Sequence, residues 1–166
     1  MTVSTQQYLK SFHDATKAMG EKAVSSDFAF EIEGFEANWL LCKQAPLAQL
    51  SPAGEIEVPT ALGSTIWQAQ QIKTAQQGQI TLMETVAGSI DDLLLNLITG
   101  GAYFNAKMYE GTPDKFIRAK RYERCFIQLD NADRDWENRS QVLMFNGTLF
   151  YHYYGEIIPG NSADYR

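Results

Sequence analysis

The sequence contains few of the residues from which metal centres and catalytic sites are built. Its 166 residues include only two cysteines, Cys42 and Cys125, and two histidines, His13 and His152. The cysteines are too few and too far apart for a disulfide framework or a zinc site, so we expect buried free thiols. No glycine-rich phosphate loop, nucleophile elbow or zinc-ligand spacing is present. We therefore expect no enzyme, no cofactor and no metal.

Long hydrophobic runs and an excess of basic charge are also missing. No apolar run reaches the roughly 18 residues of a membrane span, and the N-terminus has no hydrophobic signal core, so we expect a cytoplasmic product. Lysine and arginine number 14 against 20 acids, a net charge of -6. Tight wrapping of nucleic acid needs a basic face. An acidic wall would instead let nucleic acid slide past, because it repels phosphate.

The segment 139–156, RSQVLMFNGTLFYHYYGE, is the most informative stretch that is present. Written as a strand, its alternating residues place apolar and aromatic side chains on both faces. A strand of a monomeric sandwich usually has one wet face, so this pattern predicts a second partner for the outer side. Gly147 in mid-strand indicates a bend or a bulge. We interpret His152 as a packed or interface imidazole, because no serine or cysteine shares a motif with it.

Two segments have the periodicity of helices. Residues 5–23 predict an amphipathic helix, packed on the outside of the domain or on a neighbouring subunit. Residues 89–99, SIDDLLLNLIT, predict a helix capped by Ser89 with Asp92 three residues later and ended by two glycines. Its apolar face is expected to close an open mouth of the sheet.

The remaining periodic segments predict strands. We expect one hairpin from 27–35 with 39–45 and another from 64–73 with 78–86. Segment 116–130 is long enough for one bent strand or two short ones. The fold class is therefore mainly β: a two-sheet sandwich or barrel with one inserted α-helix and an N-terminal helix. We divide the chain into an N-terminal helical extension (1–26), a β domain (27–156) and a C-terminal arm (157–166).

Residues 46–63 predict a long connection that carries Pro46, Pro52 and the apolar island IEVP. A loop this long and this apolar is uncommon inside a compact domain. Two interpretations remain open for it: a flap folded back on its own sheet, or an arm that reaches a neighbouring copy of the chain.

Two charged clusters follow in the second half of the sequence. The cations lie within 115–124, and the acids lie in the loop 130–138 around Trp136. We expect the cations to pair with another protein surface rather than with nucleic acid. The acids lack the glycine and the terminal glutamate of a calcium loop, so they form either a solvated loop or partners for the cations.

The order of these elements resembles the tail-tube proteins of contractile-tailed bacteriophages and the tube-forming proteins of type VI secretion. The resemblance covers 27–156 and is carried by DFAFEIEGF, WLLCKQA, GEIEVP, GQITLMET, SIDDLLLNLI, YFNAKMYEG, ERCFIQLD and DNADRDWENRSQVLMFNGTLFYHYYGE. It implies hexameric rings whose sheets join between subunits into one barrel around a channel. Stacked rings would form a tube that conducts DNA without binding it specifically.

The resemblance also implies partners and residue roles. The partners would be further copies of the chain, a tail sheath, and baseplate or tail-end proteins, in a virion tail assembled in the bacterial cytoplasm. Ring stacking is expected of Glu55, Ile56, Val58, Pro59 and Leu62. Sheath contact is expected of Ser89, Asp91, Asp92 and Asn96. Contacts between subunits are expected of Arg118, Lys120, Arg121, Asp133 and Asp135.

The channel wall is the least determined part. Six copies would carry roughly -36, and Glu31 and Glu33 are candidates to line the channel. The N-terminal helix is extra relative to the minimal tube fold and leaves a baseplate tube initiator or a tail-end adaptor as an alternative. A ligand-binding β-sandwich using Tyr151 to Tyr154, and a small enzyme using His152, are further alternatives.

Overall fold

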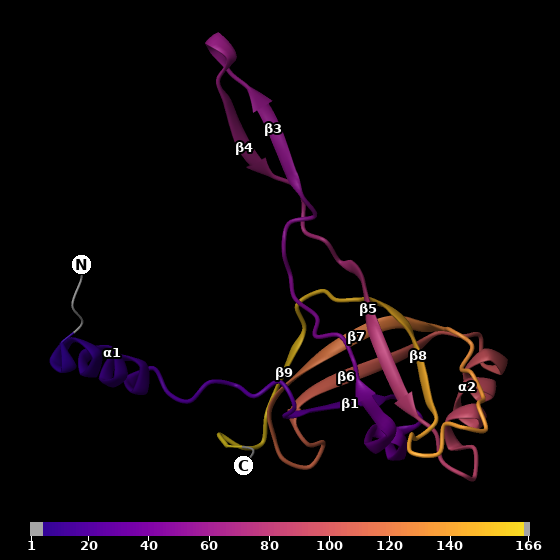
Figure 1. Ribbon diagram of the computed structural model, residues 1–166. Helices are drawn as coiled ribbons and strands as arrows, with labels where there is room; N and C mark the ends of the chain where they lie inside the picture. The colour runs from indigo at the N-terminus through magenta and orange to yellow at the C-terminus, as the bar shows by residue number, and fades with distance from the viewer. Residues whose placement is uncertain (1–4, 165–166) are drawn as a thin grey trace.

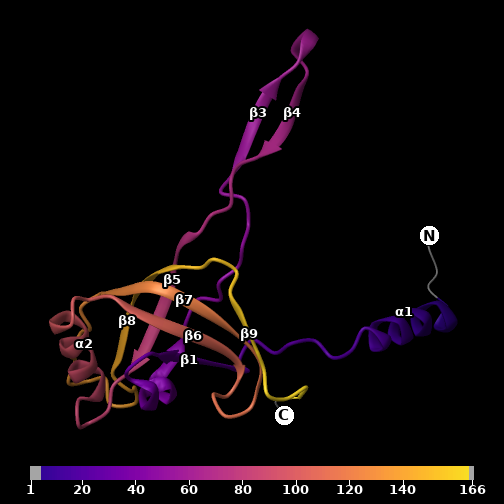
Figure 2. The ribbon, with the colours of Figure 1, turned by 180° about the vertical axis from the view of Figure 1, so that it is seen from behind.

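The computed structural model describes residues 5–164, which form a barrel-like body with two projections (Figure 1). One projection is a two-stranded arm and the other is the N-terminal helix, and Figure 2 shows both from behind. The elements are α1 (Gln6–Ala18), β1 (Phe28–Ile32), η1 (Glu36–Leu41), β2 (Cys42–Gln44), β3 (Glu55–Pro59), η2 (Ala61–Gly63), β4 (Thr65–Ala69), β5 (Ala75–Met83), α2 (Ser89–Thr99), β6 (Phe104–Gly111), β7 (Phe116–Leu129), β8 (Met144–His152) and β9 (Ile157–Pro159).

The body is one antiparallel sheet that curls until it nearly closes. Its strands follow the order β1-β6-β7-β8-β5-β2, and β9 pairs with the first half of β7. β7 is a single bent strand, one of the two expected forms of this segment. At the bend Arg124 has a φ of 48° and the pairing with β8 shifts register. The predicted mainly β fold with an inserted and an N-terminal helix is confirmed.

The core fills the space inside the curled sheet. Phe30, Ile80 and Leu149 are almost fully buried from three different strands, and Tyr122 is buried between them. Helix α2 adds its apolar face to the same cluster through Ile90, Leu93 and Leu97. Each such side chain stabilises the fold by about 2 kcal/mol through removal of apolar surface from water.

The N-terminus of α2 is capped differently from the expectation. Ser89 is the first helical residue, and the cap position is Gly88 in the left-handed conformation. The Glu84 carboxylate accepts hydrogen bonds from the backbone N–H groups of Ile90 and Asp91, each at 3.0 Å. Thr85 Oγ1 accepts from Ser89 N at 3.2 Å. The preceding loop therefore satisfies the free helix donors in place of the predicted Ser89 and Asp92 pair.

Strand β8 confirms part of the expectation for 139–156. Leu149 and Tyr151 point into the core, and Phe150 on the other face stacks on Phe126 with ring centroids 4.8 Å apart. Gly147 is not a bend, because the pairing with β5 continues through it without a shift. A side chain there would come within 2.3 Å of the carbonyl oxygen of Gln128. Glycine is therefore required by close approach of β7.

Neither predicted hairpin forms. β1 pairs with β6, and the segment expected as its partner becomes η1 followed by the short β2, which pairs with β5. β4 pairs with β3 instead of β5. Sequence periodicity identifies which segments are extended, but the partner of each strand is set by packing across the whole body.

Candidate functional site

The arm, residues 55–69, is the most conspicuous candidate surface. β3 and β4 pair from Glu55 with Ala69 to Pro59 with Thr65, and the hairpin projects away from the body (Figure 1). None of its residues is buried. The structure thus has an arm and not a flap folded back on its own sheet. An isolated two-stranded hairpin is marginally stable in water, and no buried residue of these strands supports this one.

The two faces of the arm differ in chemistry. The register pairs Val58 with Ile66, and Ile56 lies two residues from Val58, so these three apolar side chains share one face. Glu57 pairs with Trp67 on the other face. The apolar side chains remain exposed, with 57% of Ile66 accessible to water. A stripe of this kind on a projecting element is typical of a protein contact.

Leu62 at the tip of the arm combines exposure with backbone strain. Its φ is 59°, in the left-handed region, and its side chain is fully exposed. A non-glycine residue in this region costs about 1 kcal/mol. A strained, exposed leucine gains nothing within this chain, which favours a contact made outside it.

The root of the arm, residues 46–49, is fixed to the interior of the body. Tyr122 donates its hydroxyl hydrogen to the carbonyl oxygen of Pro46 at 2.6 Å and accepts from Ala48 N at 2.8 Å. Burial raises the pKa of Tyr122, so the phenol remains a neutral donor. Its ring stacks on Tyr151 with centroids 4.7 Å apart. The sequence analysis missed this contact, because no local pattern links residues more than seventy positions apart.

The predicted inter-subunit cations make contacts within this chain. Lys120 Nζ donates to the carbonyl oxygen of Ala48 at 2.7 Å, at the arm root. Arg118 pairs with Glu110 at 2.9 Å. Arg121 lies 3.7 Å from a carboxylate oxygen of Glu33.

The predicted acidic partners lie elsewhere. Asp133 and Asp135 belong to an exposed loop, and Asp135 Oδ1 accepts from Glu137 N at 3.0 Å to form a turn. The ion pairs of Arg118 and Arg121 go to other acids, so the structure does not bring the two clusters together within one chain. Their role between subunits stays a prediction.

Glu31 and Glu33 lie on the outer face of β1. Glu31 accepts a hydrogen bond from the Tyr109 hydroxyl at 3.2 Å, and burial together with the Glu31 charge raises the pKa of Tyr109 to about 12. Beside them is a second apolar cluster, in which Ala29, Tyr109 and Ala119 are buried under partly exposed neighbours such as Trp39. The outer face of β1, β6 and β7 is thus partly apolar and partly ion-paired.

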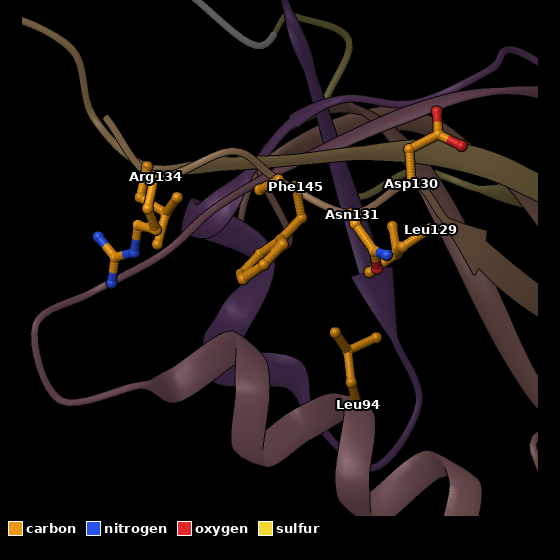
Figure 3. Close-up of a pocket in the computed structure, with 8 residues that line it drawn as sticks. Leu94, Leu129, Asp130, Asn131, Arg134 and Phe145 are labelled. Atoms are coloured by element: carbon orange, nitrogen blue, oxygen red, sulfur yellow. The ribbon is translucent and has the colours of Figure 1, made fainter. Parts of the chain in front are cut away.

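The exposed surface of α2 carries the residues expected to face a sheath. Asp91, Asp92 and Asn96 are exposed, whereas Ser89 is half-buried against Thr85. Between α2 and the loop after β7 lies a cavity of about 430 Å³. Figure 3 shows Leu94 and Phe145 directed into it and the Asp130 carboxylate directed away. The lining mixes apolar side chains with Asp130, Asn131 and Arg134, so the cavity is a partly polar packing space without a recognisable catalytic arrangement.

Within residues 5–164 no group of three or more His, Cys, Asp or Glu side chains could hold a metal ion. Burial raises the pKa of the free thiols Cys42 and Cys125 to about 12, which makes them poor nucleophiles. His152 Nδ1 lies 3.3 Å from the carbonyl oxygen of Arg124. No helix in this part of the chain is long and apolar enough to cross a membrane.

The fold, a curled sheet with an inserted helix and a projecting hairpin, is similar to the folds of solved components of contractile injection systems. The tube-terminating cap of the anti-feeding prophage has a TM-score of 0.56 and 11% identity, covering 84% of this chain and 93% of that chain. A chain of the sheath-tube complex of the extracellular contractile injection system PVC has a TM-score of 0.56 and 10% identity, covering 87% of this chain and 95% of that chain. A chain of the anti-feeding prophage baseplate has a TM-score of 0.52 and 15% identity, covering 87% of this chain and 100% of that chain.

These likenesses concern the fold, because the identities are low. No family model matches the chain, and no curated protein sequence matches it. The fold expected from the resemblance is confirmed, and the matched regions span most of both chains.

Proposed function

We propose that this chain is a structural subunit of a contractile tail or injection machine, and that its rings stack through the arm into the inner tube. The observation that carries this proposal is the arm itself. It is an unsupported hairpin with an apolar face and a strained leucine at its tip. The hexameric ring and the conduction of DNA come from the family resemblance.

The arm is suited to a head-to-tail contact between rings. Its root is held rigidly by Tyr122 and Lys120, so the direction of the hairpin is set by the body. Ile56, Val58 and Leu62, together with Glu55 and Pro59, are the stacking contacts. A contact between different surfaces of identical copies does not close between two subunits but continues, which produces an open stack.

A specialised ring of the same fold is the second candidate, and α1 favours it. No side chain of α1 is buried, and its exposed apolar residues include Tyr8, Leu9 and Phe12. A 13-residue helix without a buried side chain is marginal in water, so α1 is suited to lie on another subunit. A tube initiator at the baseplate or an adaptor at the tail end would have such a neighbour.

The remaining alternatives have less support. A ligand-binding sandwich would need the tyrosines of 151–154 at the surface, but Tyr151 and Tyr153 are each only 3% exposed. For an enzyme, His152 has neither a nucleophile nor an orienting carboxylate among its hydrogen-bond partners in the described chain.

For contact with a surrounding sheath, our candidates remain the residues of α2 named above: Ser89, Asp91, Asp92 and Asn96.

Electron microscopy of the purified protein tests the proposal. We expect rings and stacks in the parent protein. Val58→Asp places a charge in the apolar face of the arm and should weaken stacking by several kcal/mol per ring, because the buried charge is repeated in every subunit. Rings and the circular dichroism spectrum should be retained.

Thr99→Asp is the matched control, since it adds the same charge at an exposed position of the body outside the arm. We expect this variant to stack like the parent. Equal stacking of the Val58→Asp variant would overturn the arm assignment. A parent protein that stays monomeric at high concentration would overturn the assembly function.

A further inference from the structure

One outer face of the body is almost free of charged side chains across three strands, with Asp130 at its rim. We call it the amide face: Gln77 and Gln79 of β5, Asn146 and Thr148 of β8, and Gln128 of β7. Gln79 and Gln128 both pair with Thr148 in register, from its two sides. Directly opposed residues share a face of the sheet, so these three form one continuous row.

The next row extends the amide face toward β2. Thr81 pairs with Asn146, and its Oγ1 lies 2.9 Å from Asn146 Oδ1 and 3.3 Å from Gln44 Oε1. A shallow depression of about 390 Å³ lies on this face, and Asp130 at its rim is the only charged residue that lines it. In the other direction the face ends at the stacked rings of Phe126 and Phe150.

The outer face of β1, β6 and the first half of β7 differs from the amide face because it carries charged side chains. Glu31, Lys107 and Arg121 form a fully charged row across these strands. Arg121 also lies between Glu33 and Glu123. The second apolar cluster lies on the same face. The apolar cluster is suited to the core of a protein contact, and the ion pairs are suited to its polar rim.

A surface that contacts protein must adhere to it. A channel wall must not adhere, since a polymer has to move along it. Fixed cations repeated around a ring would hold a polyanion by counterion release. Neutral amide and hydroxyl groups remain hydrated and exchange hydrogen bonds with water at little net cost. A sheet face almost without charge is also unexpected toward bulk solvent in a chain with 20% charged residues.

We infer that the amide face is the channel wall of the assembled ring and that the charged face with Glu31 and Glu33 contacts protein. The inference rests on the ring function proposed above and names the surface that a passing polymer meets. Such a wall exerts no strong field on a hydrated polymer, which therefore slides without ion pairing.

Cysteine labelling of assembled particles tests the inference. Thr148→Cys reports on the amide face and Lys107→Cys on the charged face. The parent protein gives the background of its two shielded thiols. Each variant is labelled both as assembled particles and as dissociated subunits. Two reagents are used in each state: a small maleimide, and a maleimide attached to a polymer too wide for the channel.

A channel position admits the small reagent and excludes the large one, a protein contact excludes both, and an outer surface admits both. On assembly we expect Thr148→Cys to lose labelling by the large reagent only, and Lys107→Cys to lose labelling by both. Any other pattern at Thr148→Cys in intact tubes overturns the inference and leaves the tube function standing. A parent protein that forms no rings overturns both.

Discussion

At the scale of single residues, a few side chains connect the arm to the core. The Tyr122 hydroxyl satisfies the part-buried carbonyl of Pro46 and the buried N–H of Ala48 at the arm root. Gly147 permits the close approach of two strands that a larger residue would separate. Residues of this kind determine geometry without carrying chemistry.

Tyr122→Phe should destabilise the protein while retaining the aromatic ring that stacks on Tyr151. Removal of the hydroxyl takes this partner from the buried Ala48 N and the part-buried Pro46 O, at a cost of about 1–3 kcal/mol. The free energy of unfolding, measured in denaturant, checks this. Tyr154→Phe is the control, because Tyr154 is exposed and should leave that free energy unchanged. Equal values for both variants would mean that the arm root is not held by Tyr122.

At the scale of elements, α2 depends on a carboxylate that precedes it. Burial alone would raise the pKa of Glu84, but hydrogen bonds from Ile90, Thr85 and Asp91 outweigh that effect and lower it. The ionised form is therefore the one that the folded helix prefers. A depressed pKa contributes stability above the unfolded value, and that stability is lost as the pH falls through the folded value.

Glu84→Gln should cost about 1 kcal/mol of stability at neutral pH, because the amide loses the charge and one of the two oxygens that accept from Ile90 and Asp91. The difference from the parent should shrink as the pH falls through the depressed pKa of Glu84. Thermal unfolding across an acidic pH series measures it. Asp92→Asn is the control, since it removes a charge from the same helix turn without removing a cap. A larger effect from Asp92→Asn would restore the capping pattern expected from the sequence.

At the scale of the whole molecule, assembly brings together copies that each carry a net charge of -6. Repulsion between them opposes ring formation, whereas the apolar faces of the arm and α1 favour it. Salt screens the first effect and leaves the second largely intact. The balance of these effects decides how assembly responds to ionic strength.

Raising the ionic strength from low to physiological should shift assembly to lower protein concentration. Sedimentation velocity over a concentration series measures the shift, with circular dichroism to show that the fold is unchanged. The opposite response, dissociation by salt, would mean that ion pairs between subunits dominate. That result would favour the predicted contacts of Arg118 and Arg121 with Asp133 and Asp135 over apolar stacking.

The elements themselves could largely be predicted from the sequence. Helix α2 occupies Ser89–Thr99 as its periodicity indicates, and β1, β6 and β8 lie within the expected segments. The apolar island at 56–59 marked this segment as unusual, but the choice between a flap and an arm came from the structure. These successes share one cause: an amphipathic period and its flanking breakers are local properties that a single segment contains in full.

What the sequence by itself determined is the mainly β class, the inserted helix, and a chain with apolar surface left over for partners. Only the tertiary structure decided which strands pair, that β4 joins β3 in the arm, and that Tyr122 fixes the arm root. It also decided that the glutamines of β5 meet Thr148 and Gln128 in one uncharged face. The reason is physical: pairing and burial depend on contacts between distant segments, and no local period records them.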